Sequence, residues 1–127
     1  MRIIPLTALI ELHAESLAKH GGASGTRDLG AIEAALARAD QLLAYADPLP
    51  DAVDVAAAVS AALCRAHGFV DGNKRASAIA LGVTSHMNGL YLDITQGDGE
   101  RMFLALAAGE LSEDAFRDWV RAHCVDD

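Results

Sequence analysis

The chain has 127 residues, 52% of them apolar and 5% aromatic, and eighteen acidic side chains outnumber ten basic ones to give a net charge of -8. This length suits one domain, which we expect to span residues 1–127, and the alanine-rich composition favours an all-α fold over a β-sandwich. The negative charge argues against nucleic acid as a direct partner, because its phosphates would repel the chain.

Nothing in the sequence indicates a membrane or an oxidising compartment. No apolar run approaches the length of a membrane span, and the first residues become acidic too early for a secretory signal. Cys64 and Cys124 lie in apolar helical patterns and lack a close second cysteine. We therefore expect a cytoplasmic protein with two reduced packing thiols.

The first predicted helix follows Pro5, which suits the first turn of a helix. Its apolar face comprises Leu6, Leu9, Ile10, His13 and Leu17. The helix should end at Gly21 and Gly22. A glycine-rich loop then leads to Asp28, a good N-cap, and to a second helix with Leu29, Ile32, Leu36 and Leu43 at helical spacing. We expect this helix to have a frayed or broken end before Pro48 and Pro50.

Two largely apolar segments predict a pair of central helices. Residues 52–66 are alanine-rich with few charges, as expected of a helix surrounded by others. Residues 73–87 predict the second, with Ile79, Ala80, Val83 and Met87 facing inward and residues 88–89 ending it. The stretch HGFVDG would then connect two buried helices.

The last third predicts two further helices. Residues 90–94 alternate like a short strand, but a lone strand has no evident partner, so it adds little to the predicted fold. A helix is expected over residues 98–108, and another begins at the N-cap Ser112. We expect Phe116, Trp119 and Val120 to form the buried side of this last helix.

Residues 67–75, HGFVDGNKR, carry more chemistry than a structural turn needs. If Asn73 caps the following helix, free N–H groups and the helix dipole make an anion site in the loop. Lys74 and Arg75 can bind phosphate oxygens, and Asp71 is free for a hard cation such as Mg²⁺. His67, one loop away, can take a proton from a hydroxyl near neutral pH.

The segment HGFVDGNKR resembles the motif of the Fic/Doc superfamily: a His, then a Phe two positions later, an acidic residue, Gly-Asn and basic residues. The resemblance covers nearly the whole chain through Leu12 and His13, the glycine-rich loop at 21–28 and the Gly-Glu-Leu turn at 109–111. It implies a compact single-domain, all-α bundle of about six helices, with the active-site loop between two central helices.

Lys74 makes the motif most similar to the death-on-curing (Doc) branch, because Fic adenylyltransferases usually carry Gly at this position. The resemblance implies that ATP binds with its γ-phosphate toward the attacking hydroxyl. The chain would then be a Ser/Thr protein kinase and the toxin of a type II toxin–antitoxin system. The expected substrate is a translation factor, elongation factor Tu, whose phosphorylation on a Thr halts translation.

Carried over residue by residue, the resemblance implies a role for each group of the motif. His67 would be the base that activates the target hydroxyl, Asp71 would hold Mg²⁺, and Phe69 would anchor the loop in the core. The phosphate cradle for ATP would comprise Gly72, Asn73, Lys74 and Arg75. Arg65, just before the motif, would contact phosphate or substrate. A cognate Phd-like antitoxin would place its C-terminal segment on a groove near this site.

The sequence departs from the Fic/Doc motif at two positions, and several alternative functions stay open. Ala78 replaces a second arginine found in many Fic enzymes, and Gly72 stands where some Doc toxins carry Ala. The same site could instead transfer AMP, or the chain could act mainly as an antitoxin-binding corepressor. A histidine before glycine at a helix end is commonly only a cap, and the spacing of Cys64 and His67 occurs in zinc sites, although no second ligand pair is evident.

Overall fold

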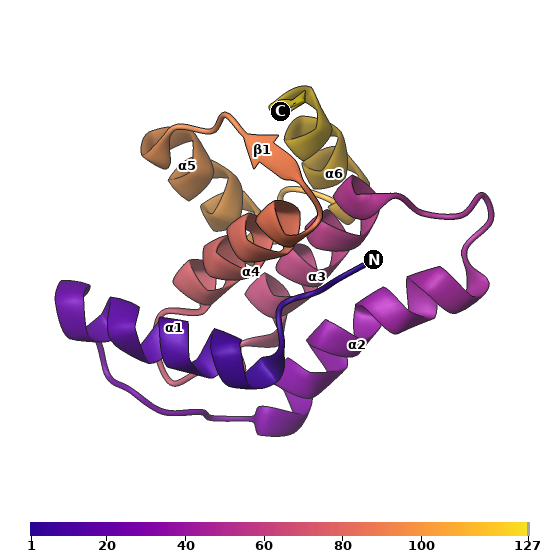
Figure 1. The fold of residues 1–127 in the computed structure, drawn as a ribbon. Coiled ribbons are helices and arrows are strands. Elements are labelled where there is room, and N and C mark those ends of the chain that lie inside the picture. Colours follow the sequence, from indigo (N-terminus) through magenta and orange to yellow (C-terminus); the bar gives the residue numbers. More distant parts are fainter. Residues whose placement is uncertain (127) are drawn as a thin grey trace.

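Figure 1 shows the chain folded as three layers of paired helices. The structure, a computed structural model, describes residues 1–126. Within them, α3 (Ala52–Ala66) and α4 (Asn73–Met87) form the middle layer. On one side lie α1 (Leu6–His20) and α2 (Leu29–Tyr45), and on the other lie α5 (Gln96–Ala107) and α6 (Glu113–Ala122). The expected all-α fold and its six helices are confirmed for this part of the chain.

Each face of the central pair has its own apolar core. Ten of the 15 residues of α3 are buried, which confirms it as the central helix. The core toward α1 and α2 includes Ile4, Leu9, Ile32, Val59 and Phe69. The core toward α5 and α6 includes Ala57, Cys64, Phe103, Phe116 and Val120. Across residues 1–126, no helix has both the length and the apolar character needed to cross a membrane.

A buried polar pair fixes the register of the α3–α4 hairpin. The Ser60 hydroxyl donates to the Ser77 carbonyl at 2.9 Å, and the Ser77 hydroxyl donates back to the Ser60 carbonyl. Both side chains are fully buried, where an unpaired hydroxyl would be costly. The pairing holds the two helices that carry the ends of the HGFVDG loop at a fixed relative height.

Side-chain caps explain where four of the described helices begin. Asp28 accepts from Ala31 N at the start of α2, as expected. At α3, Asp51 and Asp54 form a reciprocal capping box. Thr95 caps α5, which therefore begins at Gln96 rather than at the predicted Asp98, and Ser112 caps α6 as expected.

The segment after α4 forms part of a two-stranded ribbon. β1 (Leu90–Leu92) pairs antiparallel with β2 (Cys124–Asp126), with Tyr91 opposite Val125. The expectation that this strand has no partner was wrong. Its partner lies at the other end of α5 and α6, and such a distant pairing leaves no local pattern in the sequence.

Several predicted core positions are more exposed than their helical spacing implied. Leu43 is 37% exposed, because α2 runs unbroken to Tyr45 and its last turn extends beyond its neighbours. On α4 only Ala80 of the predicted inward face is fully buried, whereas Ile79, Val83 and Met87 are half-buried. Trp119 is also half-buried, stacked on Phe116 and against His123.

Candidate active site

His67 stands exposed where α3 ends. Its backbone is left-handed, with φ 49° and ψ 40°, and it is the one non-glycine residue with positive φ in the described chain. That conformation costs a non-glycine residue roughly 1–2 kcal/mol, so the surrounding structure must hold it in place. The turn leads the chain out of α3 and leaves the imidazole at the loop between the two central helices.

The loop after His67 is held by the glycine-rich segment that links α1 to α2. Thr26 and Phe69 form an isolated antiparallel bridge. Three backbone hydrogen bonds join the segments: Arg27 N and Asp28 N donate to the Gly68 carbonyl at 2.7 and 2.9 Å, and Val70 N donates to the Gly25 carbonyl at 3.1 Å. A Cβ at Gly68 would collide with the Ile32 side chain, so glycine permits this close approach.

Asn73 bonds the loop rather than capping the helix. Its Oδ1 accepts from Phe69 N at 2.9 Å, and its Nδ2 donates to the Phe69 carbonyl at 3.0 Å. The N-cap of α4 is Gly72, with φ 73°, so the expectation that Asn73 caps α4 was wrong. The short amide reaches back across the turn, and its partner Phe69 is itself 2% exposed in the core toward α1 and α2.

The first turn of α4 presents unbonded donors and two cations. The first intrahelical bond runs from Ala76 N to the Gly72 carbonyl at 2.9 Å. Within the described chain, the N–H groups of Asn73, Lys74 and Arg75 precede that bond and remain available to a ligand. The Lys74 side chain is exposed, whereas Arg75 is half-buried and donates to the Gly21 carbonyl at 3.3 Å. Cations at a helix N-terminus interact unfavourably with the positive end of the helix dipole, and a bound anion would offset this repulsion.

Asp71 is exposed and its carboxylate accepts two backbone N–H groups. Oδ1 accepts from Gly72 N at 2.8 Å, and Oδ2 accepts from Ala23 N at 3.3 Å. These bonds orient the carboxylate between the glycine-rich segment and the start of α4. Each oxygen has a second lone pair, so the group can still bind a cation.

Metal binding by side chains alone is not supported. Among residues 1–126, no three His, Cys, Asp or Glu side chains lie together as a metal site built from side chains would need. Mg²⁺ instead commonly uses one or two carboxylates together with phosphate oxygens of the substrate. Asp71 beside a helix N-terminus with unbonded N–H groups fits that donor set.

Arg65 lies on the last turn of α3 and is exposed. One guanidinium nitrogen donates to the Leu111 carbonyl at 2.8 Å, so the arginine is tied to the turn between α5 and α6. Burial raises the pKa of the nearby Cys64 thiol, and the charges of Lys74 and Arg65 partly oppose this rise. Both cations are thus close enough to act on one buried group. Cys64 and Cys124 are free thiols, as expected.

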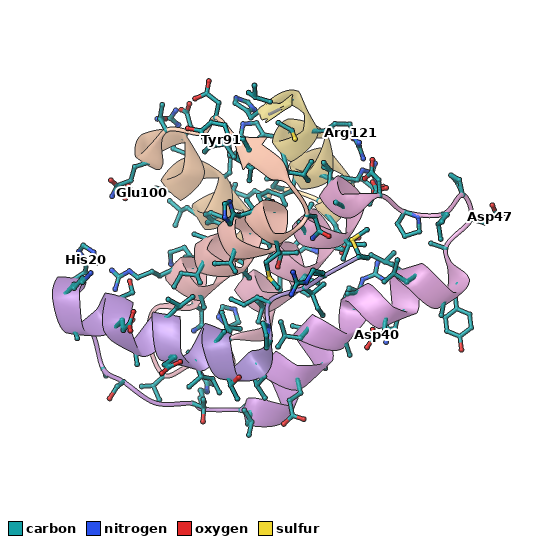
Figure 2. The ribbon with its side chains drawn as sticks, in the orientation of Figure 1. His20, Asp40, Asp47, Tyr91, Glu100 and Arg121 are labelled. Carbon is teal, nitrogen blue, oxygen red and sulfur yellow. The ribbon has the colours of Figure 1, made fainter. Side chains whose placement is uncertain are left out.

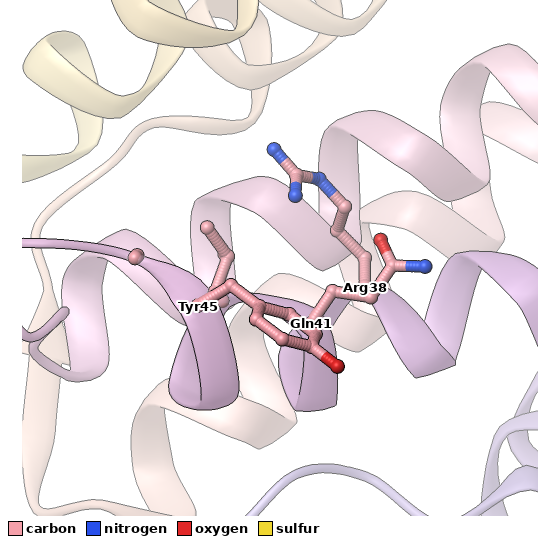
Figure 3. Close-up of a pocket in the computed structure, with 5 residues that line it drawn as sticks. Arg38, Gln41 and Tyr45 are labelled. Carbon is pink, nitrogen blue, oxygen red and sulfur yellow. The ribbon is translucent and has the colours of Figure 1, made fainter.

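Two shallow hollows lie on the surface of the described residues, at different distances from the loop after His67. A groove of about 400 Å³ runs between α1 and α4, with apolar Leu12, Ala78 and Ile79 and charged Glu15 and Lys19 along it. The other hollow lies at the C-terminal end of α2, where Figure 3 shows Arg38, Gln41 and Tyr45. The start of α2 bonds the active-site loop, and its 17 residues span about 25 Å. The second hollow therefore lies far from the loop after His67.

The structure gathers most of the predicted site residues at one place and adds one that the sequence did not single out. His67, Asp71, Lys74 and Arg75 lie on the loop or the first turn of α4. His13, predicted on the apolar face of the first helix, is 2% exposed and contacts this loop from α1. The indication in the sequence was a histidine on an apolar helix face, since a buried polar group there needs a hydrogen-bond partner.

Comparison with known proteins agrees with this geometry. Residues 3–84 match the model of the Fic/DOC family, and they include all of α1 to α3, the loop and most of α4. Toxin Doc of Mycolicibacterium smegmatis (strain ATCC 700084 / mc(2)155) is 41% identical over 72 residues, which are 57% of this chain and 55% of that protein. The match thus spans about half the length of this relative. The chain belongs to the Fic/DOC family.

Proposed function

We propose that the protein is the toxin of a toxin–antitoxin system and that it is a protein kinase, which transfers the γ-phosphate of ATP to a Thr or Ser hydroxyl of a translation factor. The observation that carries the proposal is the first turn of α4, where the free N–H groups begin at Asn73 and the Lys74 side chain is exposed. The resemblance to Toxin Doc supports the biological role.

The proposed reaction is an in-line displacement with His67 as general base. The oxygen of the target hydroxyl bonds to the γ-phosphorus, and the bond from that phosphorus to the β–γ bridging oxygen breaks. His67 takes the hydroxyl proton, and ADP leaves. Phosphoryl transfer depends mainly on positioning and charge stabilisation, so a preformed donor cradle with one base is sufficient machinery.

Each group around the first turn of α4 has a separate proposed role in binding the nucleotide. The N–H groups of Asn73, Lys74 and Arg75 would bind phosphate oxygens, and Gly72 lets the backbone approach them closely. The Lys74 ammonium adds a mobile point charge, and Arg75 can bind two oxygens at once. Asp71 would hold Mg²⁺, which when bound would neutralise charge on the phosphate oxygens.

Lys74 and Arg65 are proposed to decide how the nucleotide lies. Adenylyltransferases of this family usually carry Gly where this chain has Lys74, which leaves room for a triphosphate in the opposite sense. A lysine side chain there narrows that space and favours the γ-phosphate beside His67. Arg65 keeps further donors on its guanidinium besides the one bonded to Leu111, and we assign these to phosphate or substrate.

An antitoxin is proposed to bind the groove between α1 and α4. The groove has an apolar wall, including Ala78, Ile79 and Val83, and a charged rim formed by Glu15 and Lys19. An amphipathic helix is the usual ligand of such a groove. Ala78 lies one turn beyond Arg75, so an occupant of the groove would reach the phosphate cradle.

The transfer is tested with two ATP samples, one labelled at the γ-phosphate and one at the α-phosphate, with elongation factor Tu as acceptor and His67→Ala as control. We expect label from the γ sample alone, lost in His67→Ala, and an acceptor mass increased by one phosphoryl group. Label from the α sample, with a mass increase of one AMP, would replace the kinase by a nucleotidyltransferase. Growth arrest that survives His67→Ala would favour the corepressor role.

A further inference from the structure

Each of the four peptide units that follow His67 is held by a hydrogen bond from elsewhere in the chain. The glycine-rich segment bonds Gly68 and Val70, and the Asn73 amide bonds Phe69. The fourth, Asp71, depends on a side chain from α1, because its carbonyl lies 2.8 Å from His13 Nε2. This contact is the one that the reaction proposed above leaves without a role.

His13 contacts the loop at three residues, Phe69, Asp71 and Gly72. A carbonyl oxygen only accepts hydrogen bonds, so Nε2 carries the proton and donates to Asp71. The imidazole stacks on Phe69 with ring centroids 3.9 Å apart and planes 28° apart. Gly72 completes the contact, since a Cβ there would lie 3.1 Å from Nε2. The lack of a side chain at Gly72 makes room for this imidazole.

Packing alone does not account for a histidine at this position. His13 is 2% exposed on the apolar face of α1, where Leu or Phe would bury more apolar surface without a polar group to satisfy. Its hydrogen bond fixes the carbonyl of Asp71, while the Asp71 carboxylate is fixed by Gly72 N and Ala23 N. Backbone and side chain of the proposed Mg²⁺ ligand are thus each held by hydrogen bonds.

We propose that His13 is a positioning residue for phosphoryl transfer, which sets the Asp71 carboxylate and the first N–H groups of α4 for a metal-bound nucleotide. This inference rests on the proposed function. Without the Nε2–H bond, the Asp71 peptide can rotate toward solvent, and the carboxylate loses its fixed direction. Groups that orient a metal ligand typically change metal affinity or activity about 10- to 100-fold when removed.

Two substitutions separate the hydrogen bond from the packing. His13→Phe keeps an aromatic ring against Phe69 but removes the donor, whereas His13→Gln keeps an N–H at a similar reach but removes the ring. We expect His13→Phe to raise the KM for Mg²⁺ and lower kcat, together by about 10- to 100-fold, with the KM for the acceptor protein unchanged. His13→Gln should keep most of the wild-type kcat and KM for Mg²⁺, because it keeps the donor.

Val120→Ala is the matched control for stability, because Val120 is fully buried in the core toward α5 and α6. It should lower the thermal midpoint without changing the KM for Mg²⁺. If His13→Phe behaves in the same way, with activity falling only as the folded fraction falls, His13 is a packing residue and the inference is wrong.

A binding measurement decides the inference independently of turnover. Mn²⁺ affinity in the presence of ATP, measured by electron paramagnetic resonance, should be at least about tenfold weaker in His13→Phe than in the wild-type protein. Wild-type protein that binds Mn²⁺ and ATP but transfers no phosphate would overturn the proposed kinase. Equal affinities in wild type and His13→Phe would instead overturn the role of His13, whatever the activity.

Discussion

The amide of Asn73 bonds both backbone polar groups of Phe69, accepting from its N–H at 2.9 Å and donating to its carbonyl at 3.0 Å. These two hydrogen bonds connect the backbone of the buried Phe69 to the first turn of α4 and so close the loop between them. Only a side chain with both a donor and an acceptor at this length can make both bonds. Asn73 therefore shapes the loop that leads into α4, in addition to the phosphate contact proposed for it.

Asn73→Asp should damage both the loop and the chemistry. The carboxylate can still accept from Phe69 N, but it leaves the Phe69 carbonyl without its donor and faces it with a negative charge. We expect a loss of about 1–3 kcal/mol in the free energy of unfolding, measured with urea. Phosphate transfer should fall at least about tenfold, because the new charge repels the nucleotide.

Asn88→Asp is the matched control, since Asn88 also uses its amide to bond backbone. It accepts from Arg2 N and donates to the Arg2 and Thr84 carbonyls at the far end of α4. The variant should lose stability to a similar extent and keep its transfer rate per folded molecule. Full activity in Asn73→Asp would show that this clamp is not needed to form the site.

His67 should show a conflict between stability and activity. Its backbone has φ 49°, which glycine adopts at little cost and which alanine adopts only under strain. We expect His67→Gly to be more stable than His67→Ala by about 1 kcal/mol in urea unfolding. Both variants should lose γ-phosphate transfer, because both lack the base. Equal stability of the two would mean that the left-handed turn relaxes when the imidazole is removed.

The sequence predicts the helices around the candidate site well, because the necessary information is local. The bounds of α3 and α4 follow from one alanine-rich stretch and one apolar helical pattern, and HGFVDG falls between them. The Asp28 cap also depends only on residues three positions apart. Chemistry that lies within a single short segment can be inferred before its neighbours are known.

What the sequence could not predict are contacts between distant segments. His13 meets the Asp71 carbonyl 58 positions away, and Leu90 pairs with a strand near the other end of the chain. Asn73 could be read as a cap because its usual preference fits that role, but a left-handed Gly72 moved the cap by one residue. In that last case tertiary packing overrode a local preference.

Stability at low pH should depend on the link between α3 and α6. Arg121, labelled in Figure 2, binds Asp51 at 2.8 and 3.2 Å and Asp54 at 2.8 Å. Its hydrogen bonds hold the pKa of Asp51 below the ordinary value of 3.8, although burial opposes this effect. The charged carboxylate is thus the stabilised form. Its contribution is present above about pH 4 and is lost as the pH falls through the lowered pKa.

Arg121→Gln should therefore reduce the free energy of unfolding by about 0.5–1 kcal/mol at pH 7, a modest value because both side chains are about half exposed. The difference from the wild-type protein should shrink as the pH is lowered from 5 to about 2 in urea titrations. Arg101→Gln, which removes an exposed pair with Asp98, is the control and should have a smaller effect. A difference that does not change with pH would exclude the carboxylate as its source.

Gly68→Ala should separate the glycine-rich segment from the active-site loop. The added Cβ would overlap the Ile32 side chain and lie 3.0 Å from the Asp28 carbonyl, and the backbone atom cannot move without breaking the start of α2. Such overpacking costs about 1–3 kcal/mol of unfolding free energy, and we expect transfer per folded molecule to fall as well. Gly82→Ala is the opposite case, since its Cβ would meet nothing within 4 Å in the middle of α4. Gly82→Ala should gain about 0.5–1 kcal/mol in the free energy of unfolding and keep its rate of phosphate transfer. If Gly68→Ala is tolerated equally well, the close contact at Gly68 is not required.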